Sequence, residues 1–186
     1  MSVKTLRMKR AWTYDELVAE MPETTQPAEL WDGELIMPPA PAFRHQEVAQ
    51  RVEEALRGWV RERSLGVVAH APLDVVLAPR RVVQPDILYI SQGRRAIIQE
   101  QIRGVPDLVV EVVSPGTWRR DHIDKKAMYE QVGVQEYWIV DPEAGAIAVL
   151  TLEHGGYRLV GRFGRGERAR SVLFMGFEVS VDEILG

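Results

Sequence analysis

The feature that most constrains this chain is a glutamate placed inside a run of valines and followed by a lysine-bearing segment. Residues 106–129 read PDLVVEVVSPGTWRRDHIDKKAMY, and the apolar segment 108–113 is interrupted only by Glu111. A carboxylate in apolar surroundings is costly to desolvate unless another group pairs with it. Candidate partners lie close by, because the helix expected after the Ser-Pro-Gly-Thr turn carries Lys125 and Tyr129. We therefore expect a strand, a turn and a helix to hold half of a metal-dependent site.

The size and composition indicate an ordinary globular protein. Its 186 residues suit one domain with a single core, and 46% of them are apolar. No apolar run approaches the length of a membrane span, and the first residues lack the apolar stretch of a secretory signal. We therefore expect a cytoplasmic protein without membrane contact. The absence of cysteine excludes disulfides, thiolate zinc sites and cysteine nucleophiles.

The charge balance bears on nucleic-acid binding. The chain has 23 basic and 27 acidic residues, for a net charge of -4. A protein that coats nucleic acid through bulk charge is usually basic, so that class is excluded. DNA remains an expected partner through local clusters, although a solvated surface is the simpler explanation of each cluster taken alone. The clusters are Arg80–Arg81, Arg94–Arg95 and Arg119–Arg120.

The N-terminal part of the chain predicts a short helix, a hairpin and a long helix. Thr13 and Glu16 match a capping box for a helix over 14–20, after a loosely held arm of 1–12. Asp32-Gly33 favours a two-residue turn between strands at 30–31 and 34–37. The longest helix carries a buried stripe at helical spacing. Its members are Ala49, Val52, Leu56 and Val60, with His45 one turn earlier.

The rest of the chain predicts a mixed sheet. Strands are expected at 67–70, 73–77, 82–83, 87–90, 108–113 and 136–140, followed by a hairpin of 147–152 with 157–160. A helix is expected over 118–132, residues 96–103 fit either a short helix or a strand, and the tail closes with a turn of helix. This order predicts one α/β domain over 1–186, with an arm and short helix at 1–28, a core at 29–152 and a hairpin and tail at 153–186.

Four carboxylates occupy positions that suggest chemistry: Glu34, Asp86, Asp107 and Glu111. Alternation along a strand puts Asp107 and Glu111 on one face of the sheet. Magnesium is usually held by one or two carboxylates together with waters and substrate phosphate. Phosphodiester hydrolysis uses such an ion to activate water and to neutralise the phosphate.

A lysine completes this kind of site, because an ammonium can position the water or stabilise charge on the phosphate. Lys125 and Lys126 are the candidates. On an α-helix, Asp121, Lys125 and Tyr129 share one side at spacings of four.

Several candidates also have a structural explanation. Asp86 and Asp107 follow prolines and could simply mark strand entries. Asp121 with Lys125 could be an ordinary helix ion pair, and His45 could be a core histidine. Glu111 is harder to explain without function, because a buried strand glutamate needs a partner.

The same residues carry a resemblance to a known family. The chain has Asp-Gly-Glu-Leu at 32–35, a histidine opening a helix at His45, Val-Gln-Pro-Asp at 83–86 and Pro-Asp-Leu-Val-Val-Glu-Val-Val-Ser-Pro at 106–115. The match continues through Asp121, Lys125 and Tyr129 to Gly-Val-Gln-Glu-Tyr-Trp-Ile-Val-Asp-Pro at 133–142. This pattern, over roughly 30–152, resembles the Uma-two family of putative restriction endonucleases.

The resemblance implies a restriction-endonuclease-like PD-(D/E)XK core, in which a mixed central sheet is flanked by helices and holds Mg²⁺ at one edge, with Mn²⁺ as a substitute. It assigns the metal to Asp86, Glu111 and Glu34. The superfamily lysine is expected two residues after the second acid, where this chain has Val113, so the resemblance assigns that role to Lys125. The supporting positions are His45, Asp107, Asp121 and Tyr129.

Three functions follow as hypotheses. The first is a Mg²⁺-dependent DNA endonuclease, and the second is a catalytically silent domain of the same fold that binds nucleic acid or protein. The third is a homomeric structural or regulatory protein, in which Tyr137, Trp138 and the late hairpin bury an interface, although a core strand explains the same residues. A homodimer is expected.

Overall fold

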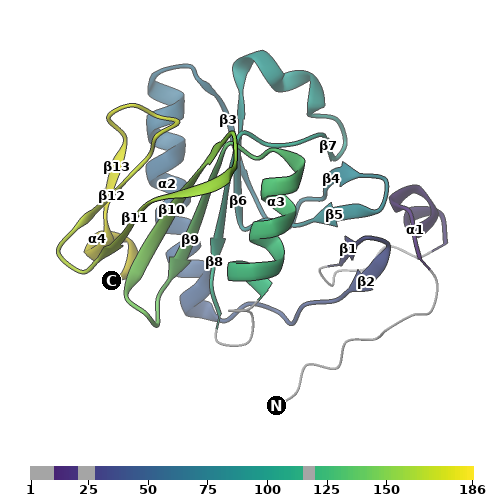
Figure 1. The fold of residues 1–186 in the computed structure, drawn as a ribbon, viewed down its shortest axis with the longest axis horizontal. Helices are drawn as coiled ribbons and strands as arrows, with labels where there is room; N and C mark the ends of the chain where they lie inside the picture. Colours follow the sequence, from purple (N-terminus) through teal and green to yellow (C-terminus); the bar gives the residue numbers. More distant parts are fainter. Residues whose placement is uncertain (1–10, 21–27, 115–119) are drawn as a thin grey trace.

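The computed structural model describes residues 11–20, 28–114 and 120–186. Its centre is a six-stranded sheet in the order β11-β10-β9-β8-β6-β3 (Figure 1). β8 and β9 run parallel, and every other neighbouring pair is antiparallel. The mixed α/β architecture expected from the sequence is therefore confirmed. The strands are β3 (Gly66–His70), β6 (Ile87–Ser91), β8 (Leu108–Val112), β9 (Glu136–Asp141), β10 (Ala146–Glu153) and β11 (Gly156–Gly164).

Helices cover both faces of this sheet, because its central strands are apolar on both sides. Helix α2 (Phe43–Glu62) lies behind the sheet and α3 (Lys126–Val132) lies in front of it in Figure 1. One core cluster joins Val110 of β8 to α2, and the other joins Val109 to α3. The helical stripe read from the sequence is buried as expected: Ala49, Val52, Leu56 and Val60, with Val48 beside them.

A second sheet of five short strands lies beside the first, in the order β2-β1-β5-β4-β7. Its hairpin turns at Asp32 and Gly33, which have φ of 52° and 90°, as the Asp-Gly pair predicted. Helix α1 (Tyr14–Glu20) begins with the predicted capping box, in which the backbone N–H of Thr13 donates to Glu16 at 2.9 Å. The strands are β1 (Glu29–Trp31), β2 (Glu34–Ile36), β4 (Val75–Ala78), β5 (Arg81–Val83) and β7 (Ile102–Arg103).

Two elements differ from the expectation. The ambiguous stretch contains both alternatives, because the 3₁₀ helix η1 (Gln92–Ile97) is followed by the short strand β7. The helix before β9 begins as a π-helical segment, η2 (Arg120–Lys125), before α3 takes over. Gly133 ends α3 with φ of 93°, the left-handed geometry that favours glycine at this position. Within the described ranges, no helix combines the length and the apolarity needed to cross a bilayer.

The C-terminal segment packs on the core through a buried acid. It contains β12 (Arg168–Arg170), β13 (Glu178–Ser180) and α4 (Val181–Leu185). Glu136 is completely buried and accepts hydrogen bonds from backbone N–H groups of residues 172 and 173 at 2.7 and 2.8 Å.

Tyr137 and Trp138 are also completely buried, within the chain itself. The suggestion that they form a dimer interface is therefore wrong, and the alternative of a core strand is correct. The homodimer remains a prediction that these residues do not support.

Candidate active site

Glu111 lies at the centre of a buried polar cluster on the face of the sheet that α3 covers. The Lys125 ammonium lies 2.8 Å from Glu111 Oε1, and the Tyr129 hydroxyl donates to the same oxygen at 2.6 Å. Glu111 and Lys125 are each only 3% exposed. The expectation that a glutamate among valines needs nearby partners is confirmed, and both partners come from the segment following its own strand.

Tyr129 acts as a hydrogen-bond donor in this cluster. Burial raises the pKa of its hydroxyl well above the usual value, and the negative charge of Glu111 raises it further. The hydroxyl therefore stays protonated and holds the Glu111 carboxylate in a fixed orientation. The Lys125 ammonium and the Tyr129 hydroxyl replace contacts with water that the buried Glu111 carboxylate lacks.

A second carboxylate, Glu29, contacts the same lysine. Its Oε1 lies 3.2 Å from Lys125 Nζ, and its side chain is also buried. Glu29 was not among the candidates, because the expected strand began one residue later, at Leu30. The register of β1 and β2 gives the signal that could have found it, since Glu29 and Glu34 share one face of the hairpin.

Asp86 precedes β6, the strand that pairs directly with the strand of Glu111. β6 pairs with β8 so that Ile87 faces Val110, and this places the preceding Asp86 opposite Glu111. The Asp86 Oδ2 accepts a hydrogen bond from the backbone N–H of Val112 at 2.7 Å. Its side chain is 17% exposed, whereas the side chain of Glu111 is 4% exposed.

His45 supports Asp86 from the first turn of α2. Its Nε2 lies 3.1 Å from Asp86 Oδ2, and its side chain is mostly buried. The histidine therefore points toward the sheet, as its place on the apolar stripe indicated. The structure links α2 to the same end of the sheet as Glu111.

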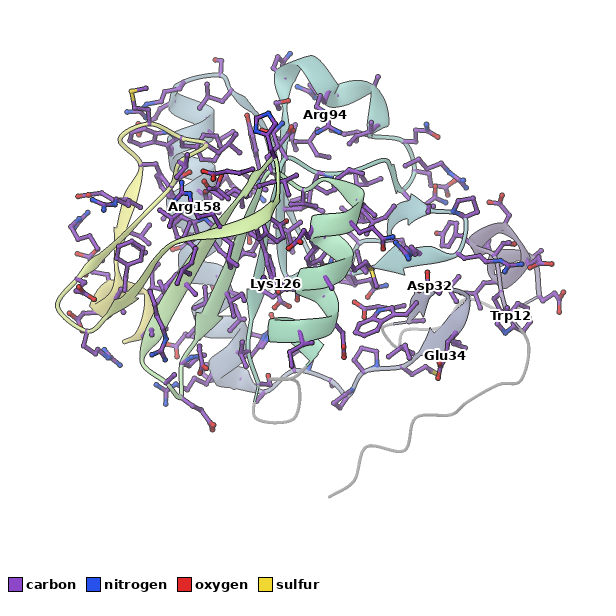
Figure 2. The ribbon with its side chains drawn as sticks, viewed as in Figure 1. Trp12, Asp32, Glu34, Arg94, Lys126 and Arg158 are labelled. Atoms are coloured by element: carbon purple, nitrogen blue, oxygen red, sulfur yellow. The ribbon has the colours of Figure 1, made fainter. Side chains whose placement is uncertain are left out.

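The remaining candidates lie at other places. Glu34 lies on β2 opposite Trp31, at the turn end of the hairpin (Figure 2). Lys126 lines a surface pocket of about 630 Å³ with Glu130 and Gly156, whereas its neighbour Lys125 points to Glu111. The side chain of Asp121 lies outside the described residues.

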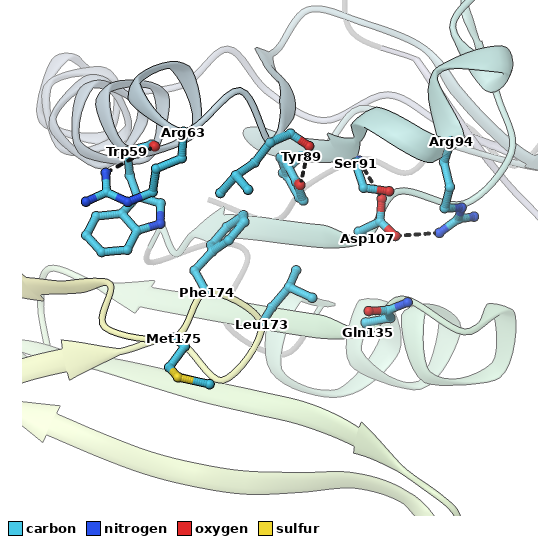
Figure 3. Close-up of a pocket in the computed structure, with 11 residues that line it drawn as sticks. Trp59, Arg63, Tyr89, Ser91, Arg94, Asp107, Gln135, Leu173, Phe174 and Met175 are labelled. Carbon is cyan, nitrogen blue, oxygen red and sulfur yellow. Dashed lines mark hydrogen bonds and ion pairs between the residues drawn. The ribbon is translucent and has the colours of Figure 1, made fainter.

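Asp107 lies at the opposite end of β8 from Glu111, about 13 Å away along the strand at the usual rise per residue. Its carboxylate accepts from the backbone N–H of Ser91 at 2.7 Å and pairs with Arg94 at 2.8 Å (Figure 3). These contacts fix the end of β6 and the start of η1. These contacts agree with the structural alternative of a strand entry, and the supporting role of Asp107 in the site stays a prediction.

The arginine pairs expected to contact DNA are partly engaged in the fold. Arg94 is held by Asp107, and Arg81 is held by Asp32 at 2.6 Å and by the side chain of Gln131 at 2.6 Å. Arg80 and Arg95 are exposed.

The donor set fits a divalent cation of the magnesium type. No group of three or more acids and histidines is arranged as a metal site in the described part of the chain. Magnesium needs less, since it is commonly held by one or two carboxylates with waters and substrate phosphates. Asp86 and Glu111 are hard oxygen donors of this kind at one end of the β6–β8 pair, where Asp86 contacts His45 of α2 and Glu111 contacts Lys125 and Tyr129.

The fold is a mixed α/β domain of the restriction-endonuclease-like class. A solved structure of a putative nuclease belonging to DUF820 from Anabaena variabilis shares the fold, with a TM-score of 0.76 at 18% identity. The similarity covers 93% of this chain and 97% of that one. The chain belongs to the Uma2 family, whose description is "Putative restriction endonuclease" and whose model matches residues 14–182.

A weaker likeness is to the type IIG restriction endonuclease BpuSI, with a TM-score of 0.43 and 13% identity. It covers 78% of this chain and 16% of that one. No curated protein matches the chain.

Proposed function

We propose that this chain is a divalent-metal-dependent endonuclease that hydrolyses DNA phosphodiester bonds, with Mg²⁺ as its cofactor and Mn²⁺ as a substitute. The observation that carries the proposal is the contact of Lys125 with Glu111, across the strand pair from Asp86. Membership of the Uma2 family supports the same class of activity.

Asp86 and Glu111 would hold the cation, and Glu34, at the turn end of the β1–β2 hairpin, has no part in this proposal. A bound divalent cation lowers the pKa of a water nucleophile and neutralises charge on the phosphate. Attack of water on phosphorus breaks one P–O ester bond and leaves a phosphate end and a hydroxyl end. Asp86 is the more exposed acid, so the phosphate approaches from its side.

The protein positions these acids by hydrogen bonds. Tyr129 orients the Glu111 carboxylate, and His45 together with the backbone N–H of Val112 orients Asp86. Lys125 supplies the positive charge that holds the attacking water or the phosphate in place. Preorganised charges of this kind act without reorganising during the reaction.

The alternative is a catalytically silent domain that binds nucleic acid or protein through the same fold. One observation favours it: Glu111 and Lys125 are buried against each other, and a structural ion pair explains that contact. The two functions differ in whether the acids are needed for a measurable reaction or only for folding.

Plasmid cleavage with Mg²⁺ or Mn²⁺ tests the proposal on the parent chain, Asp86→Asn and Glu111→Gln. Both variants are expected to lose about 10²-fold or more of the activity, a typical cost of removing one electrostatic catalytic group. Asp124→Asn is the matched control, because Asp124 is an exposed acid next to Lys125. Unchanged cleavage in both acid variants contradicts the site, and DNA binding without Mn²⁺ binding supports the silent alternative.

A further inference from the structure

Lys125 has two carboxylate partners from two different sheets. Glu111 on β8 of the six-stranded sheet lies 2.8 Å from the ammonium, and Glu29 on β1 of the five-stranded sheet lies 3.2 Å from it. All three side chains are buried. The ammonium therefore has a second negative partner available within a short movement of its flexible stem.

Glu29 is held in place by groups other than the lysine. Its Oε1 accepts from the backbone N–H of Gln84 at 3.1 Å, and its Oε2 accepts from the indole of Trp31 at 3.1 Å. Each carboxylate oxygen has its own donor, so the position of Glu29 does not depend on whether Lys125 stays on Glu111.

If the proposed function is correct, a divalent cation and the Lys125 ammonium compete for the carboxylate of Glu111. Glu111 Oε1 lies 2.8 Å from the Lys125 ammonium. A divalent cation bound to the same carboxylate would repel that ammonium. Burial makes the repulsion stronger than it is in water. The reaction needs the amine of Lys125 in the site. The ammonium therefore has to shift away from Glu111 and still remain in the site.

We infer that Glu29 is a positioning residue that retains the Lys125 ammonium when a divalent cation binds Glu111. The inference rests on the proposed function and deepens it. Glu29 lowers the energy of the displaced lysine, and it therefore strengthens metal binding without being a metal ligand. Its effect on metal affinity depends on the presence of Lys125.

Two other roles for Glu29 predict different results. A metal ligand, or a charge that acts on the ion directly, affects metal affinity equally with and without Lys125. A purely structural residue changes the unfolding temperature and leaves metal affinity unchanged. A double-mutant cycle separates these roles, because it measures the interaction between two positions.

The experiment is calorimetric titration with Mn²⁺ of four folded proteins: the parent, Glu29→Gln, Lys125→Met and the double variant. Glu29→Gln is expected to weaken Mn²⁺ binding about tenfold in the parent and only about twofold in the Lys125→Met background, a coupling within the usual range for neighbouring charges. Lys125→Met alone is expected to strengthen binding, because it removes the competing cation.

Equal losses in the two backgrounds, or no loss in the parent, overturn the inference while leaving the metal site intact. Absence of Mn²⁺ binding in both the parent and Lys125→Met overturns the proposed function itself, and the inference with it. Thermal unfolding of each variant checks that it is folded.

If Lys125→Met does not fold, Glu29→Asp gives a second way to contradict the inference in the otherwise intact chain. Aspartate keeps the charge but is one methylene too short to reach the ammonium. The inference predicts that Glu29→Asp loses as much Mn²⁺ affinity as Glu29→Gln, and parent-like affinity of Glu29→Asp contradicts it.

Discussion

Asp86 and Glu111 lie opposite each other at the end of the β6–β8 ladder, and the Asp86 carboxylate takes the place of a backbone acceptor there. The next ladder donor, the backbone N–H of Val112, bonds to Asp86 Oδ2 at 2.7 Å. This contact fixes Asp86 at the strand end, while Glu111 on the neighbouring strand bonds to Lys125 and Tyr129. The end of the β6–β8 pair thus carries both acidic residues, and the helical segment that follows β8 supplies the lysine.

Removal of the lysine charge is predicted to destabilise the fold. Lys125→Met leaves Glu29 and Glu111 buried without their cation, and breaking a buried ion pair in this way costs about 3–5 kcal/mol. Urea unfolding measures the loss. Adding Glu111→Gln and Glu29→Gln to Lys125→Met should recover part of the stability, and a single variant as stable as the parent contradicts the burial argument.

The contribution of Tyr129 to the stability of the fold is predicted to change at alkaline pH. Its folded-state pKa is raised above the ordinary 10.0 by burial and by Glu111. Its contribution is therefore complete below pH 10 and is lost as the pH rises above that value, because only the unfolded state releases the proton there. Tyr129→Phe should unfold with a shallower pH dependence above pH 10, measured by urea unfolding from pH 8 upward.

The same substitution has a cost at neutral pH. Tyr129→Phe removes a donor from the buried Glu111 carboxylate, which should cost about 1–3 kcal/mol. The control is Tyr157→Phe. Burial also raises the pKa of Tyr157, but its hydroxyl bonds to the backbone carbonyl of Val134 and not to an acid. An equal neutral-pH loss in both variants contradicts a special role for the Glu111 contact.

Local patterns in the sequence predicted most of the fold. The stripe of α2, the Asp-Gly turn and the valine-rich β8 each depend on neighbours within a few residues, and each is confirmed. The pairing of Glu111 with Lys125 was predictable for the same reason, since a buried charge next to a short turn has few possible partners.

Contacts between distant segments were not predictable in this way. Glu29 reaches Lys125 because the five-stranded sheet packs beside α3, and no local pattern reports how two sheets are placed. The spacing of Asp121, Lys125 and Tyr129 assumed an α-helix throughout, whereas the structure has a π-helical turn before residue 126. Asp107 shows the limit of strand periodicity. The alternation predicts on which face of the sheet a residue lies, but not at which end of the strand it lies.

Substitution of Glu136, which lies away from the candidate site, is predicted to lower the stability of the fold. Its two oxygens accept from the Trp138 indole, the Ser171 hydroxyl and two backbone N–H groups, at 2.6 to 2.8 Å. Glu136→Gln turns one acceptor into a donor that faces other donors, so a loss of about 3 kcal/mol is expected. Glu143→Gln, an exposed acid after the same strand, is the control. Hydrogen exchange should show faster opening of residues 172 and 173 in Glu136→Gln alone.

Divalent metal is predicted to stabilise the parent chain in a way that depends on Asp86. A ligand that binds only the folded state adds about 2.7 kcal/mol at a concentration of 100 times its Kd. Thermal unfolding with increasing Mn²⁺ should therefore raise the Tm of the parent progressively and leave Asp86→Asn nearly unchanged. Asp107→Asn serves as the matched acid from the other end of β8, where the carboxylate bonds to Ser91 and Arg94. It should lower the starting Tm but keep the Mn²⁺ response, and loss of that response in Asp107→Asn would place the ion at the wrong end of the strand.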